Sequence, residues 1–283
     1  MNKIVYYAPA KLNLFLHVVG RRSDGYHLLQ TVFRFIDFSD QVKLTIRDDG
    51  KIQLNTPILG VPAEKNLCIQ AAQLLQKESG TSLGVEIFLE KFIPMGGGLG
   101  GGSSDAATTL LALNRLWDLN WSKERLMGLG LNLGADVPVF IFGENAFAEG
   151  VGEKLKPIKL LPAWYLVLTP PVHVSTADIF ASKELTRNTI PVRIPPFSVG
   201  LGHNDLESVV CLAYPEVARH LEWLRQLDRT TMVAMTGSGA CVFAEFITES
   251  AARMALASVP IDMSGFVVQG LDRHPMQDFA RRG

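Results

Sequence analysis

The chain has 283 residues, of which 47% are hydrophobic and 19% are charged, and its formal net charge is −1. This composition is typical of a soluble globular protein, and the length suits one large domain or two smaller ones that need no disulfide bonds. The balanced charge argues against a nucleic-acid or membrane-surface partner, which clustered positive charge would favour, but it is compatible with a small polyanionic ligand.

The N-terminal part of the chain alternates between expected strands and one helix. The expected elements cover residues 11–18, 26–38, 41–48, 65–78 (the helix) and 84–93. The first strand has one packed face and one mostly polar face that carries Lys11 and Asn13. The Asp24-Gly25 pair predicts a turn into the second strand, and Gly80 is placed to end the helix.

Glycine and proline residues interrupt this pattern around residues 150–163, and we place a domain boundary there, between 1–157 and 158–283. The elements expected beyond it are a strand over 163–171, a helix over 175–185, a Pro-rich loop over 191–196, helical segments over 205–226, strands over 231–235 and 241–246, a helix over 248–258 and a strand over 265–270. Ser175 or Thr176 can cap the first helix, and Pro215 is placed at a helix start. This order suits a ferredoxin-like sandwich, so we predict two α+β domains.

The stretch "PMGGGLGGGSSDAA", residues 94–107, places six glycines in the seven positions 96–102 between an expected strand and a helix that begins near 103. The N-terminus of a helix carries free N–H groups and a partial positive charge, which attract phosphate. Glycines let the backbone approach an anion without a Cβ in the way. Ser103 and Ser104 add hydroxyl groups and can cap the helix. We therefore predict a cradle for an oligophosphate.

A flexible linker or a tight turn would also concentrate glycine. A linker, however, is expected between polar, aperiodic segments, whereas two strongly patterned elements flank this loop. The loop is not a Walker A motif, because no Gly-Lys-Ser/Thr ending follows it, and its surroundings are not the repeated βαβ unit of a dinucleotide-binding fold.

Three segments in the same order resemble the motifs of the GHMP kinases, the galacto-, homoserine, mevalonate and phosphomevalonate kinases. "PMGGGLGGGSSDAA" resembles their ATP-binding motif, while "PAKLNLFLHVVGRRSDGYH" and "TGSGACVFAEF" resemble the other two, so that the likeness extends from Pro9 to Phe246. It implies an α+β architecture in which 1–157 form a ribosomal-protein-S5-like domain with the ATP loop and 158–283 form a ferredoxin-like domain.

The resemblance also implies a reaction, the phosphorylation of an alcohol with ATP as co-substrate and Mg²⁺ as its counter-ion. The wording of the motifs implies that the acceptor is a cytidine-diphosphate-linked methylerythritol, phosphorylated at its C2 hydroxyl in non-mevalonate isoprenoid synthesis. The residues implied to bind ATP are Pro94, Met95, Gly96, Gly97, Gly98, Leu99, Gly100, Gly101, Gly102, Ser103 and Ser104.

Two charged residues match the catalytic pair of that family. Asp136 precedes Val137-Pro138, and by spacing alone it is a helix N-cap; the resemblance implies that it is the catalytic base. Lys11, which alone would be taken for a solvated surface charge, is implied to be its partner. A nearby ammonium group would keep the carboxylate ionised and stabilise the phosphoryl oxygens during transfer.

For the acceptor, the resemblance implies that Tyr26 and Phe180 stack on the cytosine ring and that His27 binds its edge. Asn13 and Thr176 are implied to lie close to the substrate. From the residues alone, Phe180 could equally be a core aromatic side chain, and Tyr26 an aromatic residue at the end of a hairpin. The loop "TGSGA", residues 236–240, is implied to form a wall of the phosphate site.

Several questions stay open at the level of sequence. Another GHMP kinase, acting on homoserine, mevalonate or a sugar, and a non-catalytic nucleotide-binding protein are the two alternatives. We identify no protein ligand for Mg²⁺, and the protein could be a monomer or a homodimer.

The three cysteines, Cys68, Cys211 and Cys241, form no C-x-x-C pair and no zinc-site spacing, so we expect reduced thiols. The N-terminal segment lacks the features of a signal peptide, and no apolar run reaches the ~20 residues that span a bilayer. These features predict a cytoplasmic protein.

Overall fold

The computed structural model describes residues 4–192 and 202–277. The predicted Pro-rich loop over 191–196 therefore lies outside the described residues from position 193 onward. The elements of the N-terminal half are β1 (Val5–Arg21), β2 (His27–Arg47), β3 (Ile52–Leu54), α1 (Leu67–Ser79), β4 (Gly84–Glu90), α2 (Gly101–Leu116), α3 (Lys123–Leu131), α4 (Val137–Phe142), β5 (Ala146–Glu149) and β6 (Lys154–Pro157). Those of the C-terminal half are β7 (Trp164–Leu168), α5 (Thr176–Ala181), α6 (Glu207–Ala213), α7 (Pro215–Arg225), β8 (Met232–Met235), β9 (Val242–Phe246), α8 (Glu249–Ala257) and β10 (Gly265–Leu271).

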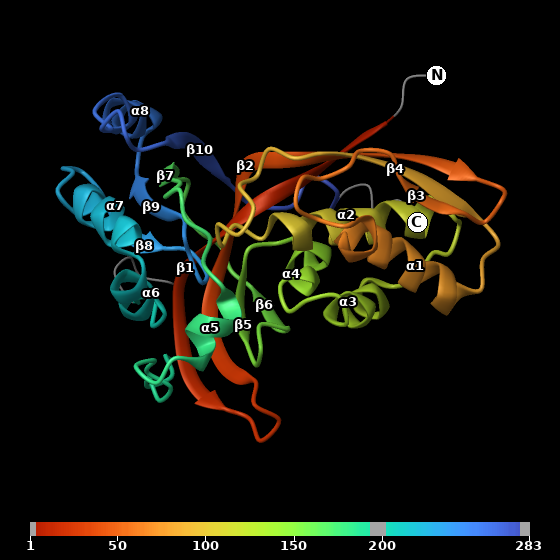
Figure 1. The fold of residues 1–283 in the computed structure, drawn as a ribbon, viewed down its shortest axis with the longest axis horizontal. Helices are drawn as coiled ribbons and strands as arrows, with labels where there is room; N and C mark the ends of the chain where they lie inside the picture. Colours follow the sequence, from red (N-terminus) through yellow and green to blue (C-terminus); the bar gives the residue numbers. More distant parts are fainter. Residues whose placement is uncertain (1–3, 193–201, 278–283) are drawn as a thin grey trace.

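The long β1–β2 hairpin is the central feature of the N-terminal half (Figure 1). The prediction of two strands over 26–38 and 41–48 was wrong, because β2 is a single strand. Its register against β1 shifts between Pro9, which faces Ser39, and Ala10, which faces Ile36. Two additional residues of β2 lie in this bulge, so the strand bends there and does not end.

The predicted polar face of β1 is buried and does not face solvent. Lys11 and Asn13 do share a face, but each is only 2% exposed. The glycine-rich loop lies across this part of β1, and the backbone N–H of Lys11 donates to the carbonyl of Leu99 (3.0 Å). The polar face of β1 is therefore covered by the glycine-rich loop.

The C-terminal half confirms the ferredoxin-like prediction. Its strands lie in the order β10-β7-β9-β8 and all pair antiparallel, and α5 to α8 lie between the strands along the chain. Pro215 begins α7, and Ser175 caps α5 by accepting from the backbone N–H of Asp178. The predicted helix over 175–185 is shorter than expected, because α5 ends at Ala181 and the backbone angles of Ser182 (φ −57°, ψ 138°) are not helical.

The two halves share one continuous sheet. Gly270 and Leu271 of β10 pair with Ile36 and Phe35 of β2. A cluster of buried side chains from both halves, including Leu14 of β1 and Phe243 of β9, packs where they meet. The domain division at residue 157 stays a prediction.

Two further observations concern the cysteines and membrane-spanning helices. The three cysteines carry free thiols, as predicted. Over residues 4–192 and 202–277, no helix is both long and apolar enough to cross a membrane.

Candidate active site

The glycine-rich loop connects β4 to α2, as predicted, but α2 begins earlier than expected, at Gly101. Its N-cap is Gly100, which has left-handed backbone angles (φ 73°) and no side chain with which to cap. The prediction that Ser103 or Ser104 caps the helix was therefore wrong. Both lie inside the first turns of α2, with Ser103 lining the cavity described below and Ser104 fully buried.

The glycines are required by close approaches from two sides. At Gly98, which has φ +73°, a Cβ atom would lie 2.1 Å from the carbonyl oxygen of Thr236 in the C-terminal half. At Gly100, a Cβ atom would lie 3.0 Å from Cε of Lys11 in β1. The loop is thus packed between the two halves of the molecule, and its backbone faces the space between them.

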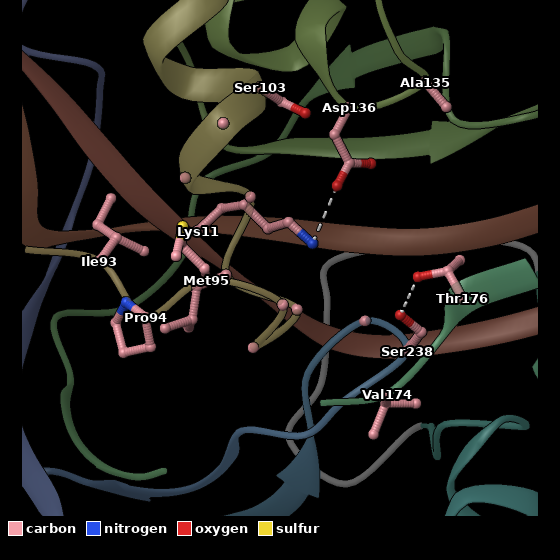
Figure 2. Close-up of a pocket in the computed structure, with 18 of the residues that line it drawn as sticks. Lys11, Ile93, Pro94, Met95, Ser103, Ala135, Asp136, Val174, Thr176 and Ser238 are labelled. Carbon is pink, nitrogen blue, oxygen red and sulfur yellow. Dashed lines mark hydrogen bonds and ion pairs between the residues drawn. The ribbon is translucent and has the colours of Figure 1, made fainter. Parts of the chain in front are cut away.

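That space is a cavity of about 690 Å³ (Figure 2). The predicted site residues that line it are Lys11, Asn13, Pro94, Met95, Gly96, Gly97, Gly98, Leu99, Gly100, Gly101, Gly102, Ser103, Asp136, Thr176 and Phe180. Three other predicted residues, Ser104, Tyr26 and His27, do not line it.

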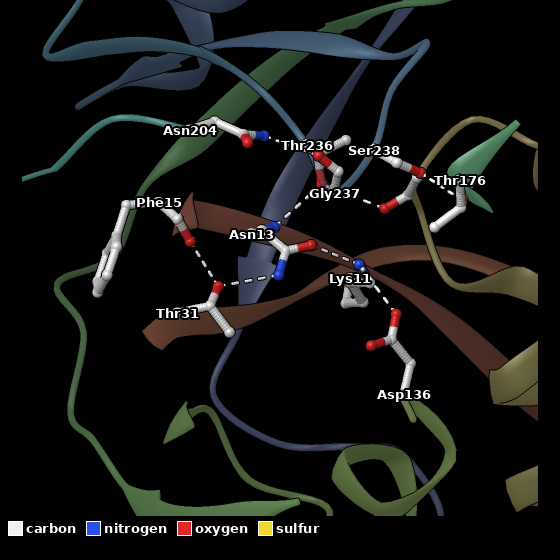
Figure 3. A network of polar contacts seen from close by, with 11 residues as sticks. Lys11, Asn13, Phe15, Thr31, Asp136, Thr176, Asn204, Thr236, Gly237 and Ser238 are labelled. Atoms are coloured by element: carbon white, nitrogen blue, oxygen red, sulfur yellow. Dashed lines mark hydrogen bonds and ion pairs between the residues drawn. The ribbon is translucent and has the colours of Figure 1, made fainter. Parts of the chain in front are cut away.

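Lys11 and Asp136 meet inside this cavity (Figures 2 and 3). The ammonium of Lys11 lies 3.2 Å from a carboxylate oxygen of Asp136, and the Lys11 side chain is 3% exposed whereas that of Asp136 is 36% exposed. Asp136 is the N-cap residue of α4, with Pro138 in the first turn, but its side chain makes no capping hydrogen bond. Its carboxylate is therefore directed to the cavity and is available for chemistry.

Asn13 holds the Lys11 ammonium from the other side. Its Oδ1 accepts a short hydrogen bond from Nζ of Lys11, and its Nδ2 donates to the hydroxyl of Thr31 (2.9 Å). Its backbone N–H donates to the hydroxyl of Thr236 (3.0 Å), which in turn donates to the carbonyl of Gly98 (3.3 Å). These bonds connect Asn13 to both β2 and the glycine-rich loop (Figure 3).

The loop 236–240 forms a wall of the cavity through Gly237, Ser238 and Gly239. The hydroxyl groups of Ser238 and Thr176 lie 2.6 Å apart and close one side of it (Figure 2).

The residues predicted to bind the cytosine ring lie at the end of the β1–β2 hairpin and on α5. Tyr26 is 64% exposed at the end of the hairpin. The ring of His27 stacks on that of Phe180, with centroids 4.9 Å apart and planes inclined by 30°. Nε of Arg187 donates to Nε2 of His27 (3.0 Å), a contact that nothing in the local sequence around either residue indicates.

Two further charged residues of the cavity were missed from the sequence. Nζ of Lys91 bonds to Asp105 on α2 (2.6 Å) and, at shorter range, to the fully buried Asp40. Burial raises the pKa of Asp105 to about 7, against the opposing charge of Lys91. Asp105 lies within the glycine-rich motif, and this position could have indicated from the sequence that it belongs to the site.

Comparisons with known proteins place these features in a family. Models of the GHMP kinases N terminal domain and the GHMP kinases C terminal match residues 66–144 and 198–264. The 4-diphosphocytidyl-2-C-methyl-D-erythritol kinase of Nitrosospira multiformis is 73% identical over 97% of this chain and 94% of its own. The 4-diphosphocytidyl-2-C-methyl-D-erythritol kinase of Nitrosomonas europaea is 64% identical over 97% of this chain and 99% of its own.

Solved structures of kinases also match this chain. A crystal structure of 4-(cytidine 5'-diphospho)-2C-methyl-D-erythritol kinase matches with a TM-score of 0.79 at 34% identity, over 94% of this chain and 99% of the other. The homoserine kinase of Cytophaga hutchinsonii matches with a TM-score of 0.67 over 97% and 96%, but at 18% identity it shows only that the fold is shared.

Proposed function

Because the chain belongs to the GHMP kinases and, within them, to the 4-diphosphocytidyl-2-C-methyl-D-erythritol kinases, we propose that its cavity holds ATP and that acceptor side by side for direct phosphoryl transfer. The reaction moves the terminal phosphoryl group of ATP to the C2 hydroxyl of the acceptor and gives the 2-phosphate and ADP. The meeting of Lys11 and Asp136 beside the glycine-rich loop carries the proposal.

The glycine-rich loop and the N-terminus of α2 hold the phosphates of ATP. The first N–H groups of this helix have no partner within it, and the helix dipole adds a partial positive charge there. Leu67 lies against Gly102, since a Cβ atom on this glycine would be 3.4 Å from its Cδ1. Leu67, Ile58 and Val61 also line the cavity and offer an apolar surface for the adenine ring.

Asp136 removes the proton of the C2 hydroxyl as the oxygen attacks the γ-phosphorus. The new O–P bond forms while the bond from this phosphorus to the β,γ-bridging oxygen breaks, and ADP leaves with that electron pair. The Lys11 ammonium, buried and held by Asn13, faces Asp136 and stabilises the charge on the transferring oxygens. Phe180 and Thr176, which also line the cavity, contact the cytidine part of the acceptor.

Residues 4–192 and 202–277 do not form a cage for Mg²⁺. Over the described part of the chain, no group of three acidic, histidine or cysteine residues could hold a metal ion. The cavity carboxylates Asp105 and Asp136 are each paired with a lysine. We infer that Mg²⁺ enters with the phosphates of ATP and keeps water ligands.

A cytoplasmic location stays a prediction.

The function is tested by ADP release from ATP·Mg²⁺ with 4-diphosphocytidyl-2-C-methyl-D-erythritol, beside homoserine, mevalonate and galactose. We expect turnover with the cytidine compound alone. ATP binding without turnover of any acceptor would disprove the assigned reaction, and turnover of a small acceptor would disprove the cytidine site.

The base is tested with Asp136→Asn, which should lower kcat by about 10²- to 10⁴-fold because the amide cannot accept the proton. Asp262→Asn is the matched control, since Asp262 is also paired with a cation, Arg219, but does not line the cavity. It should keep the activity of the wild type. Near-normal turnover of Asp136→Asn would mean that another group is the base.

A further inference from the structure

Arg187, in the segment after α5, is held in one orientation by backbone carbonyls. Its Nη1 donates to Leu185 (3.0 Å), and its Nη2 donates to Phe180 (2.9 Å) and Ser182 (2.6 Å). The remaining bond of the guanidinium runs from Nε to Nε2 of His27, at 3.0 Å. Because four bonds fix the group, its Nε–H is directed at the imidazole of His27.

This contact determines where the proton of His27 lies. A guanidinium group carries only donors and is not deprotonated in proteins, so the nitrogen that it contacts must offer a lone pair. Nε2 of His27 is therefore unprotonated, and the ring is neutral with its hydrogen on Nδ1. Burial and the charges of Arg187 and Arg21 also lower the pKa of His27.

The His27 ring lies next to a residue of the proposed acceptor site. The His27 ring stacks on Phe180, whose side chain lines the cavity. Over residues 4–192 and 202–277, Nδ1 makes no hydrogen bond, and the side chain is partly exposed. A ligand ring that reaches Phe180 would therefore meet a histidine that donates and cannot accept.

We propose that Arg187 is a specificity-determining residue, which fixes His27 as an Nδ1–H donor and thereby selects cytosine over uracil. The inference rests on the proposed function. Cytosine has a lone pair at N3, which accepts such a bond, whereas N3 of uracil carries a hydrogen that would oppose it. Arg187 acts through His27 and does not itself touch the base.

The tautomer is tested without any substrate. A ¹H–¹⁵N correlation spectrum of the wild-type imidazoles at neutral pH should show His27 protonated only at Nδ1, with its signals assigned by their loss in His27→Gln. In Arg187→Met, the proton should be at Nε2 or shared between the two nitrogens. A wild-type His27 protonated at Nε2, or at both nitrogens, would overturn the proposal.

The specificity is tested by comparing kcat/KM for the cytidine acceptor and its uridine counterpart. We expect the wild type to prefer cytidine by about 10- to 100-fold, the effect of one unpaired polar group. In Arg187→Met this ratio should fall about tenfold or more, because His27 can then turn a lone pair toward uracil. A merely structural role for Arg187 would lower both activities equally, and an unchanged ratio would therefore contradict the proposal.

Two controls separate the possible failures. Thermal unfolding of Arg187→Met shows whether the variant folds, and if it does not, the wild-type spectrum decides. Absence of wild-type turnover with both acceptors would disprove the proposed function and leave the tautomer result standing. Equal wild-type turnover with both would disprove the proposed specificity alone.

Discussion

At the scale of single residues, the orientation of one amide decides how the Lys11 ammonium is held. The hydroxyl of Thr31 donates to the carbonyl of Phe15 and therefore can only accept from Asn13. Nδ2 of Asn13 lies 2.9 Å from this hydroxyl, which places Oδ1 toward Lys11. The carbonyl of Phe15 lies where the pairing of β1 with β2 is irregular, between Asn13 and Leu16.

We predict that Thr31→Val lowers kcat with little change in the affinity for ADP. Valine has the same shape but leaves the buried Nδ2 of Asn13 without a partner, so the amide no longer holds Lys11 in place. Loss of such a charge-assisted bond is worth about 1.5–3 kcal/mol, or about 10- to 100-fold in rate. Steady-state kinetics and ADP calorimetry measure the two effects.

Thr31→Ser is the matched control for this prediction, since it keeps the hydroxyl and removes only a methyl group. It should retain kcat to within a few-fold. Equal losses in the two variants would show that packing, and not the hydroxyl, is responsible.

At the scale of elements, the glycine-rich loop connects the two halves of the molecule in addition to its proposed role as a phosphate cradle. The N–H of Cys241 donates to the carbonyl of Gly97 (3.2 Å), and the Thr236 hydroxyl donates to that of Gly98. The loop and the segment 236–241 are thereby held as one unit. A change that separates them should affect stability and catalysis together.

Gly98→Ala is predicted to cause both losses. The residue has φ +73°, and its Cβ would lie 2.1 Å from the Thr236 carbonyl oxygen, so the loop must shift. Backbone strain of this kind costs about 1–3 kcal/mol. Chemical denaturation and ADP binding should both show the loss.

Gly128→Ala provides the control with the opposite sign. Gly128 lies within α3, and nothing is within 4 Å of the position of its Cβ. Alanine there should stabilise the protein by about 0.4–1 kcal/mol by restricting the unfolded chain. If Gly98→Ala were as stable as the wild type, the close packing of the two loops would be wrong.

At the scale of the whole molecule, the C-terminal segment after β10 returns to the N-terminal half. His274 lies edge-on against Phe35 and Phe140, and its backbone N–H donates to the carbonyl of Gly143 at the end of α4 (2.9 Å). Asp136 lies at the other end of this short helix. The last described residues of the chain therefore support the element that carries the proposed base.

His274 makes the fold sensitive to acid. Complete burial lowers its pKa to about 3, whereas the unfolded chain takes up a proton below about 6.5. The free energy of unfolding therefore falls by up to about 1.4 kcal/mol per pH unit as the pH falls from about 6.5 toward 3. Above pH 6.5 this group does not change it. Burial also lowers the pKa of His17 and His220, in the same sense.

We predict that His274→Gln is less stable than the wild type at neutral pH but loses less of its stability between neutral and acid pH. Urea unfolding over a series of pH values measures this slope. An unchanged slope in His274→Gln would show that this group does not govern the acid response.

The sequence by itself determined the order of the elements in the C-terminal half, the ferredoxin-like arrangement there and the family, and it predicted the phosphate cradle, but in the N-terminal half it did not indicate β3, α3, β5 or β6. These predictions depend on short-range patterns: the period of apolar residues, the glycine stretch and the three motifs. It did not show that β2 is continuous or that the polar face of β1 is buried. Periodicity tells which residues share a face, but not what covers that face.

Only the tertiary structure decided the partners of the polar groups. Lys11 meets Asp136, Thr31 orients Asn13, and Arg187 fixes His27, yet the members of each pair lie apart along the chain. The serines after the glycines lost the expected capping role because Gly100 turns the backbone before them. A hydrogen bond depends on distance and direction, and for distant residues both are set by how the whole chain packs.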